Sequence, residues 1–379
     1  MLPNRPIYDA DHGIFRDAVR KFFAREMMPY REAWDEAGNS PREFWRKAGA
    51  AGILCPQVDP AFGGAGADFR YNAIVVEETF YGGPAINLTV HSDIVAPYLS
   101  HYGSAELQQA WLPKMVSGDA VGAIAMTEPG TGSDLQAVRT TAVADGDDYI
   151  VNGQKTFISN GQNADLVIVV AKTDIHAAGA KGISLILVEA DRPGFGRGRN
   201  LKKIGQHAAD TSELFFDQVR VPRGNLIGAE HKGFQYLMAE LPQERLMIAI
   251  GAAAAAQHAF DITVDYVKQR RAFGQAVADF QNTRFTLAEL KAQIAVGWAY
   301  VDQCIARHGD GQLDITEAAI AKLWLTEMQC RVVDACVQLH GGYGYMEEYA
   351  IAKAYVDARA QRIYGGTSEI MKDLISRAL

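Results

Sequence analysis

The hydrophobic pattern of this chain changes its period twice along the sequence. Apolar residues recur at helical spacing from residue 9 to about residue 117, and form short strand-like runs from about 120 to 229. Helical spacing returns from Gly233 onward. Helices, then strands, then helices indicate segregated units packed side by side, and not an alternating α/β fold. We therefore predict an α+β protein with an N-terminal helical domain (1–119), a middle antiparallel β domain (120–232) and a C-terminal helical bundle (233–379).

Two local patterns are specific enough to predict single elements. Asn152-Gly153 stands between aromatic and β-branched residues, which is typical of a tight turn in a β-hairpin. Apolar residues spaced three and four apart predict a long helix over 287–305 with one buried stripe. The stripe consists of Leu287, Leu290, Ile294, Trp298, Val301 and Ile305. It could pack inside one subunit or against a neighbouring subunit.

Charge and composition exclude several classes of protein. The net charge of −8 argues against nucleic-acid binding, which needs a basic surface to neutralise phosphates. No cysteine belongs to a CxxC pair, so we predict reduced core thiols and a reducing compartment. The histidines are not spaced like metal ligands, and no metal site is predicted. The cysteines are Cys55, Cys304, Cys330 and Cys336.

Nothing in the pattern near the first residues predicts a targeting segment. Asp9, Asp11 and Asp17 interrupt any apolar run there, and helical periodicity has already begun. The longest uncharged apolar run, residues 246–256, is too short and too rich in alanine to span a bilayer. We therefore expect a soluble protein without a membrane span, located in the cytoplasm or an equivalent matrix.

Two glycine-rich segments are candidates for ligand binding. The first, MTEPGTGSD at residues 126–134, combines a turn-forming Pro-Gly-Thr-Gly with hydroxyls at Thr127, Thr131 and Ser133. Glycine lets the backbone approach a ligand closely, so such a loop can present N–H groups to a flat polar or anionic molecule. The second, IYGGTSEI at residues 363–370, precedes the last predicted helix. Taken alone, each segment is also compatible with an ordinary turn.

Three further segments occur with these two in a fixed order: KTFISNG at 155–161, RRAFGQ at 270–275 and QLHGGYGYM at 338–346. The whole set, which runs over nearly the full chain, resembles the acyl-CoA dehydrogenase family of flavoproteins, most of all its long-chain type. The resemblance implies a helical domain, a β domain and a C-terminal four-helix bundle, usually assembled as a homotetramer. It also implies an FAD-dependent oxidoreductase acting on CH–CH groups, which converts acyl-CoA thioesters to trans-2-enoyl-CoA.

In that reaction a carboxylate removes the α-proton while a hydride leaves the β-carbon for flavin N5. Most of the family carries this carboxylate as a glutamate at the position of Gly365. The long-chain and isovaleryl types place it instead on a helix, at the position that Glu244 occupies in LPQERL. The resemblance therefore implies that Glu244 is the base, in an apolar pocket that raises its pKa. From position alone, Glu244 would be interpreted as a surface carboxylate paired with Arg245 or Lys232.

The resemblance also implies a set of binding residues. Gly365 would offer its backbone N–H to the thioester carbonyl, and Arg245 and Ser133 would lie beside the substrate. The residues implied for FAD are Met126, Thr127, Gly132, Ser133, Phe157, Ser159, Arg270, Phe273, Gln338, Gly342, Thr367 and Glu369. Arg270 and Phe273 would reach the cofactor of a neighbouring subunit. Without the resemblance, Phe157, Phe273 and Gln338 would be interpreted as core-packing or capping residues.

The acyl group and the acceptor stay open at this point. Pro242 and the small residues 251–256 suggest a deep pocket for long or branched chains, but small residues also allow close helix packing. The implied acceptor is an electron-transfer flavoprotein. The alternatives are a branched-chain or terpenoid-type acyl-CoA dehydrogenase, an acyl-CoA oxidase that uses oxygen, and a non-catalytic scaffold of the same fold. Glu244 discriminates between the enzymes and the scaffold.

Overall fold

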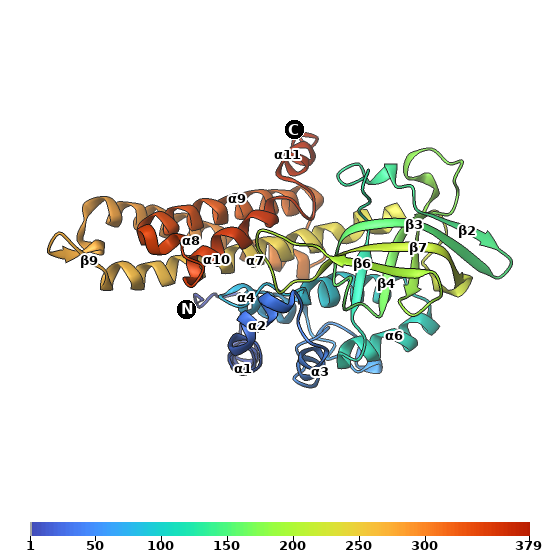
Figure 1. Ribbon diagram of the computed structural model, residues 1–379, viewed down its shortest axis with the longest axis horizontal. Helices are drawn as coiled ribbons and strands as arrows, with labels where there is room; N and C mark the ends of the chain where they lie inside the picture. Colours follow the sequence, from blue (N-terminus) through green and yellow to red (C-terminus); the bar gives the residue numbers. More distant parts are fainter. Residues whose placement is uncertain (1) are drawn as a thin grey trace.

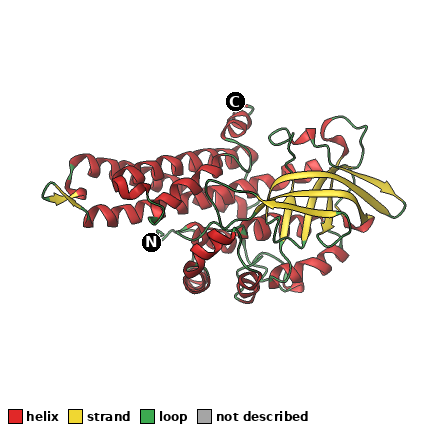
Figure 2. Cartoon of the chain, in the orientation of Figure 1, coloured by secondary structure: helices red, strands yellow, loops and turns green. Residues whose placement is uncertain are grey.

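The computed structural model describes residues 2–379 and places helices first, strands in the middle and helices last (Figure 2). The first helices are α1 (Ala10–Glu26), α2 (Arg31–Ala37), α3 (Arg42–Ala50), α4 (Phe69–Phe80), α5 (Ala96–Tyr102) and α6 (Ala105–Ser117), with a π-helix, η3 (Val90–Val95), before α5. The strands are β1 (Gly122–Ala125), β2 (Thr141–Asp145), β3 (Asp148–Ser159), β4 (Leu166–Lys172), β5 (Ile183–Glu189), β6 (Phe195–Asn200), β7 (Thr211–Pro222) and β8 (Leu226–Ile227).

The C-terminal part begins with the longest helix, α7 (Gly233–Gln269), followed by a small hairpin of β9 (Arg271–Ala272) and β10 (Gln275–Ala276). It continues with α8 (Gln281–Gly309), α9 (Ile315–His340), α10 (Ala350–Ala358) and α11 (Ser368–Ser376). Short 3-10 helices lie at η1 (Met28–Tyr30), η2 (Pro60–Phe62), η4 (Leu135–Ala137), η5 (Gly179–Gly182), η6 (Arg223–Asn225), η7 (Val277–Asp279), η8 (Gly341–Tyr345) and η9 (Arg359–Arg362).

Side-chain caps explain where several helices begin. The Asp9 carboxylate accepts hydrogen bonds from the backbone N–H groups of Asp11 and His12 and starts α1. Ser104 caps α6 in the same way, and Asp314 caps α9 through the N–H of Glu317. Each cap satisfies a donor that the first helical turn leaves without an internal partner.

Strands β1 to β8 form one twisted sheet (Figure 1). Its strand order is β6-β7-β3-β2-β4-β5-β8, with β1 beside β4. Most neighbours are antiparallel, as predicted, but β1 runs parallel to β4, and β2 meets β4 in one parallel pair, Thr141 with Lys172. The sheet is therefore mixed. The parallel pairing is possible because the long connection through β2 and β3 brings the chain back to β1 in the same direction.

The predicted hairpin turn at Asn152-Gly153 is wrong. Both residues lie inside β3, where the register with β7 shifts, and the turn between β2 and β3 contains Gly146 at φ 61°. A Cβ added at Gly153 would lie 2.5 Å from Oγ1 of Thr140, so the glycine serves a close approach. The Asn152 side chain accepts a hydrogen bond from the Gln218 backbone instead of closing a turn.

In the C-terminal part, α7, α8 and α9 pack along one another, and α10 and α11 pack against α9 (Figure 1). The apolar stripe predicted for 287–305 lies on α8 and is buried within the chain from Leu290 to Ile305, with Leu287 packed at its edge. By length and composition α7 could cross a membrane, but 67% of its most apolar 18-residue window is buried in the chain. This burial is typical of the core helix of a packed domain.

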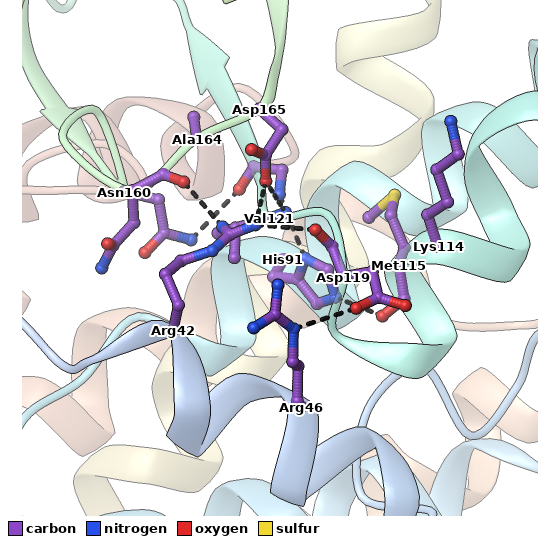
Figure 3. Close-up of polar contacts among 12 residues, drawn as sticks. Arg42, Arg46, His91, Lys114, Met115, Asp119, Val121, Asn160, Ala164 and Asp165 are labelled. Carbon is purple, nitrogen blue, oxygen red and sulfur yellow. Dashed lines mark hydrogen bonds and ion pairs between the residues drawn. The ribbon is translucent and has the colours of Figure 1, made fainter.

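A polar cluster joins the N-terminal helices to the start of the sheet (Figure 3). Arg42 on α3 donates to the Asp165 carboxylate at 2.6 Å, and this carboxylate also accepts the Val121 N–H at 2.7 Å. His91 is buried, which lowers its pKa to about 4, so the neutral ring accepts from the Gly122 N–H and donates to the Met115 carbonyl. These contacts position β1, and with it the loop that follows β1.

Candidate active site

Glu244 lies on α7, buried where α5 crosses that helix. Glu244 is only 5% exposed, and the Tyr98 hydroxyl donates a hydrogen bond to its Oε1 at 3.0 Å. The pKa of Glu244 is raised to about 7, mainly by burial. The Tyr98 hydrogen bond and the Arg245 charge oppose this shift, and the Glu240 carboxylate adds to it. The alternative of a surface carboxylate is therefore wrong. A carboxyl group with this pKa can accept and release a proton at neutral pH.

The loop that carries Gly365 packs against the same side of α7. The Nε of Arg245 donates to the Gly365 carbonyl at 3.3 Å, and Nζ of Lys322 donates to the Gly366 carbonyl at 2.6 Å. A Cβ added at Gly365 would collide with Cδ1 of Ile248, one helical turn beyond Glu244. The glycine and the glutamate that the sequence suggested as one exchange therefore lie on facing elements. Among the described residues, the Gly365 N–H has no hydrogen-bond acceptor.

The loop after β1 is tied to β3 by its backbone. The Thr156 N–H donates to the Thr127 carbonyl at 2.9 Å, and Nζ of Lys155 donates to the Met126 carbonyl at 2.9 Å. Within the loop, Glu128 and Thr131 exchange two backbone hydrogen bonds and form a tight bridge. These bonds hold Met126 and Thr127 at the end of β1. The glycine-rich tip of the loop takes no part in the bonds to β3.

A buried ion pair supports this loop, and sequence reasoning missed it. Nζ of Lys155 lies 2.9 Å from Oε1 of Glu128, and the same carboxylate accepts the backbone N–H groups of Arg139 and Thr140. Burial lowers the pKa of Lys155 to about 8. The pKa of Glu128 is lowered despite its burial, because Lys155 and the two N–H groups stabilise its charge. The sequence did contain a signal for this ion pair, because Glu128 and Lys155 are ionisable residues in two of the motifs.

The tip of the loop and the adjoining part of β3 form an exposed shelf. Gly132 and Ser133 are exposed, and a Cβ added at Gly132 would meet no heavy atom within 4 Å. Phe157 is 67% exposed at φ 60°, in the register shift of β3 between Lys155 and Ile158. A bulge of this kind turns a side chain out of the sheet, and a bulky residue at positive φ is strained, which makes Phe157 a candidate for a functional role. Open glycine backbone, a hydroxyl and an aromatic ring fit a flat, anionic cofactor.

Other predicted cofactor residues lie at the far end of the bundle. Arg270 ends α7 with its guanidinium 5.5 Å from the Tyr343 ring, and Phe273 is 97% exposed in the β9–β10 hairpin. Gln338 and Gly342 are exposed at the end of α9 and in η8, which packs on that helix. The hairpin and the sheet stand at opposite ends of the molecule (Figure 1), so one chain does not bring these residues to the shelf.

The remaining predicted residues stand near the sheet or at the start of α11. Ser159 ends β3, half-buried, opposite Thr211 of β7. The Thr367 side chain accepts from the Ile370 N–H at 3.4 Å and caps α11, and Glu369 is exposed in its first turn. Thr367 therefore has a capping role of its own.

The chain matches three family models in order: the N-terminal domain of acyl-CoA dehydrogenase over residues 9–119, the middle domain over 123–219 and the C-terminal domain over 231–379. The chain belongs to the acyl-CoA dehydrogenase family. A long-chain specific acyl-CoA dehydrogenase of Rattus norvegicus mitochondria is 52% identical over 379 residues, which are 99% of this chain and 88% of the relative. The predicted family and its oxidoreductase class are thereby confirmed.

Two solved structures of the family extend this comparison. An acyl-CoA dehydrogenase from Geobacillus kaustophilus has 51% sequence identity and a TM-score of 0.97, with 99% of each chain covered. A glutaryl-CoA dehydrogenase from Mycobacterium smegmatis, solved with FADH2, has 29% identity and a TM-score of 0.92 over 98% of this chain and 95% of that chain. The acyl-CoA dehydrogenase fold predicted from the sequence is confirmed.

Proposed function

We propose that this chain is an FAD-dependent dehydrogenase of long-chain acyl-CoA thioesters that forms trans-2-enoyl-CoA, with Glu244 as the base. The observation that carries the proposal is the buried Glu244 carboxylate, which lies on α7 beside the residue that contacts the Gly365 loop. The naming of the rat relative as long-chain specific, at 52% identity, supports the choice of substrate. A buried carboxylate with a strongly raised pKa is typical of a functional site, which favours an enzyme over a non-catalytic scaffold.

The residues divide the chemistry between them. Glu244 removes the α-proton of the thioester, and its raised pKa matches this task at neutral pH. The Gly365 N–H donates to the thioester carbonyl, where negative charge develops, and Arg245 holds that loop through the Gly365 carbonyl. Ser133, which is exposed on the shelf, would contact the substrate.

The exposed shelf is where FAD would bind, held by Met126, Thr127, Gly132, Ser133, Phe157 and Ser159, with Thr367 and Glu369 near the Gly365 loop. When bound, FAD supplies the acceptor for the hydride. Arg270, Phe273, Gln338 and Gly342 would bind the cofactor of a second subunit, since they stand at the opposite end of the chain (Figure 1). Arg270 would there counter the pyrophosphate charge.

This arrangement supports a homo-oligomer, which we propose is a tetramer. We further propose an electron-transfer flavoprotein as acceptor, a cytoplasmic location, and domain limits at 119/120 and 232/233. These limits fall in the connections between α6 and β1 and between β8 and α7.

Anaerobic titration of the purified protein with palmitoyl-CoA tests the proposed function. We expect the flavin's visible absorbance to bleach at one equivalent of thioester per site, with a charge-transfer band at long wavelength. A bound flavin that no thioester bleaches would exclude acyl-CoA dehydrogenation, and a colourless protein that takes up no FAD would favour the scaffold. Rapid aerobic turnover that produces peroxide would favour the oxidase.

A series of saturated acyl-CoA substrates tests the chain-length assignment. We expect kcat/KM to rise from butyryl-CoA to palmitoyl-CoA, because each buried methylene contributes about 0.8 kcal/mol to binding. The small residues of α7 do not by themselves support a deep pocket, since a Cβ added at Gly251 would lie 3.0 Å from the Phe80 ring. A sharp optimum at butyryl-CoA would therefore leave these residues with the role of close helix packing only.

A further inference from the structure

Two tyrosines of α5 face two glutamates of α7. The two tyrosines lie one helical turn apart, and so do the two glutamates. The Tyr98 hydroxyl donates to Oε1 of Glu244 at 3.0 Å, and the Tyr102 hydroxyl donates to Oε1 of Glu240 at 2.8 Å. Residues four apart lie on the same face of a helix, so the two bonds form consecutive rungs between the helices. We call these four residues the Tyr–Glu ladder. Its inner rung contains the proposed base.

The sequence around Pro97 sets α5 against α7. Proline has no N–H and cannot donate to the carbonyl four residues earlier, which belongs to Asp93. That carbonyl accepts instead from Nε2 of Gln243 at 2.8 Å, next to Glu244 in the chain. The wider turn of η3 precedes this point, and such turns frequently occur at functional sites. The Gln243 bond therefore fixes the position of Tyr98 relative to the base.

The inner rung engages only one oxygen of the base. Oε1 of Glu244 accepts from Tyr98, and no described residue donates to Oε2. Oε2 is not among the described buried polar atoms that lack a partner, and Glu244 is 5% exposed, so this oxygen keeps a small exposed surface. Tyr98 itself is fully buried, and burial together with the Glu244 charge raises its pKa well above the usual range, so its hydroxyl stays a donor.

The charged groups around the ladder act on Glu244 in opposite directions. Tyr98 on α5 and Arg245 on α7 stabilise the ionised carboxylate, and Glu240 on α7 opposes it. At the outer rung, Glu240 also accepts a hydrogen bond from Nδ1 of His101 on α5 at 2.9 Å. His308 on α8 interacts electrostatically with both Glu240 and His101. Burial lowers the pKa of His308 to about 4, so its ring stays neutral.

We propose that Tyr98 is a positioning residue for the base: its hydroxyl holds Oε1 of Glu244, so that Oε2 is the oxygen that takes the α-proton. The outer rung, through Glu240, opposes ionisation of the base and keeps it basic. This inference rests on the proposed role of Glu244. It assigns to Tyr98 a contribution to kcat and to the pH dependence, and none to the affinity for the acyl chain.

The pH profile of kcat/KM in Tyr98→Phe and Glu240→Gln tests the proposal. Activity requires ionised Glu244, so kcat/KM rises with pH through its pKa. Tyr98→Phe removes a donor to the carboxylate, and we expect the acid limb to move up by about one pH unit. We also expect kcat to fall roughly 10- to 100-fold with little change in KM, because the base loses its fixed orientation. Glu240→Gln removes a like charge and should move the acid limb down.

Tyr149→Phe is the matched control. Its hydroxyl donates to Glu230 at 2.9 Å in the β domain, so the substitution removes the same kind of bond away from Glu244. We expect the control to lower the melting temperature without moving the acid limb. Melting curves and flavin absorbance of all variants show that each one is folded and loaded.

The outcomes separate the two proposals. If Glu244→Gln is inactive while Tyr98→Phe keeps the wild-type acid limb and kcat, the positioning role of Tyr98 is overturned and the base assignment stands. If Glu244→Gln keeps the wild-type rate, the base assignment and the role of Tyr98 are both wrong. If Tyr98→Phe does not fold, Glu240→Gln provides the test instead. The acid limb of its kcat/KM profile must then move to lower pH, and an unchanged acid limb would overturn the proposal.

Discussion

Glu244→Gln is expected to slow reduction of the flavin by acyl-CoA about 10²- to 10⁴-fold, the usual effect of removing a general base. The amide has nearly the shape of the carboxyl group and can still accept from Tyr98, but it cannot take up the α-proton. FAD should stay bound, since Glu244 lies on α7 and not on the exposed shelf. Stopped-flow absorbance under anaerobic conditions measures the rate.

Glu230→Gln is the control for this substitution. Glu230 also accepts a tyrosine hydroxyl, that of Tyr149, but in the β domain. We expect its rate of flavin reduction to equal that of the wild-type protein. A wild-type rate in Glu244→Gln would reject the base assignment, because this variant lacks the carboxylate that is proposed to take up the α-proton.

Lys155→Met is expected to lower the free energy of unfolding by about 3–5 kcal/mol, the range for removing one partner of a buried ion pair. The substitution leaves the buried Glu128 carboxylate without its cation and the Met126 carbonyl without its donor. We also expect weaker retention of FAD, since both bonds hold the loop that follows β1. Urea unfolding followed by circular dichroism measures the first effect, and flavin release on gel filtration the second.

Two further variants show whether burial is the cause. Lys155→Met combined with Glu128→Gln should recover part of the lost stability, because the second change removes the uncompensated charge. Arg46→Met breaks an exposed ion pair, Arg46 with Asp119, and should have a much smaller effect because solvent screens that pair. Equal effects of Lys155→Met and Arg46→Met would contradict the role of the buried pair.

Part of the candidate site could be predicted from the sequence, because its signal is carried by short segments. The exchange of a glutamate at 365 for one at 244 was visible as two residues in two motifs, and the structure places the two segments on facing elements. The roles proposed for Phe157 and Arg270 came from the resemblance and stay predictions. The structure shows that both residues are exposed and that they lie at opposite ends of the folded molecule (Figure 1).

Other parts depend on contacts between distant residues, which no local pattern encodes. Asn152-Gly153 has the composition of a turn, but pairing with β7 draws it into a continuous strand, with a register shift where a Cβ would meet Thr140. The ion pair of Lys155 with Glu128 joins two motifs that the sequence shows only as separate segments. At Asn152-Gly153 the local preference for a turn yielded to the pairing of neighbouring strands.

The sequence by itself determined the order of helices and strands, the buried stripe of α8 and the identity of the motifs, because these follow from periodicity and composition within a short window. The tertiary structure alone decided the parallel pairing of β1 with β4 and the environment of Glu244. Tyr98 and Glu244 are 146 residues apart, and their hydrogen bond exists because α5 docks on α7. The pKa of a carboxyl group depends on what surrounds it in space, and the chain acquires those surroundings only when it folds.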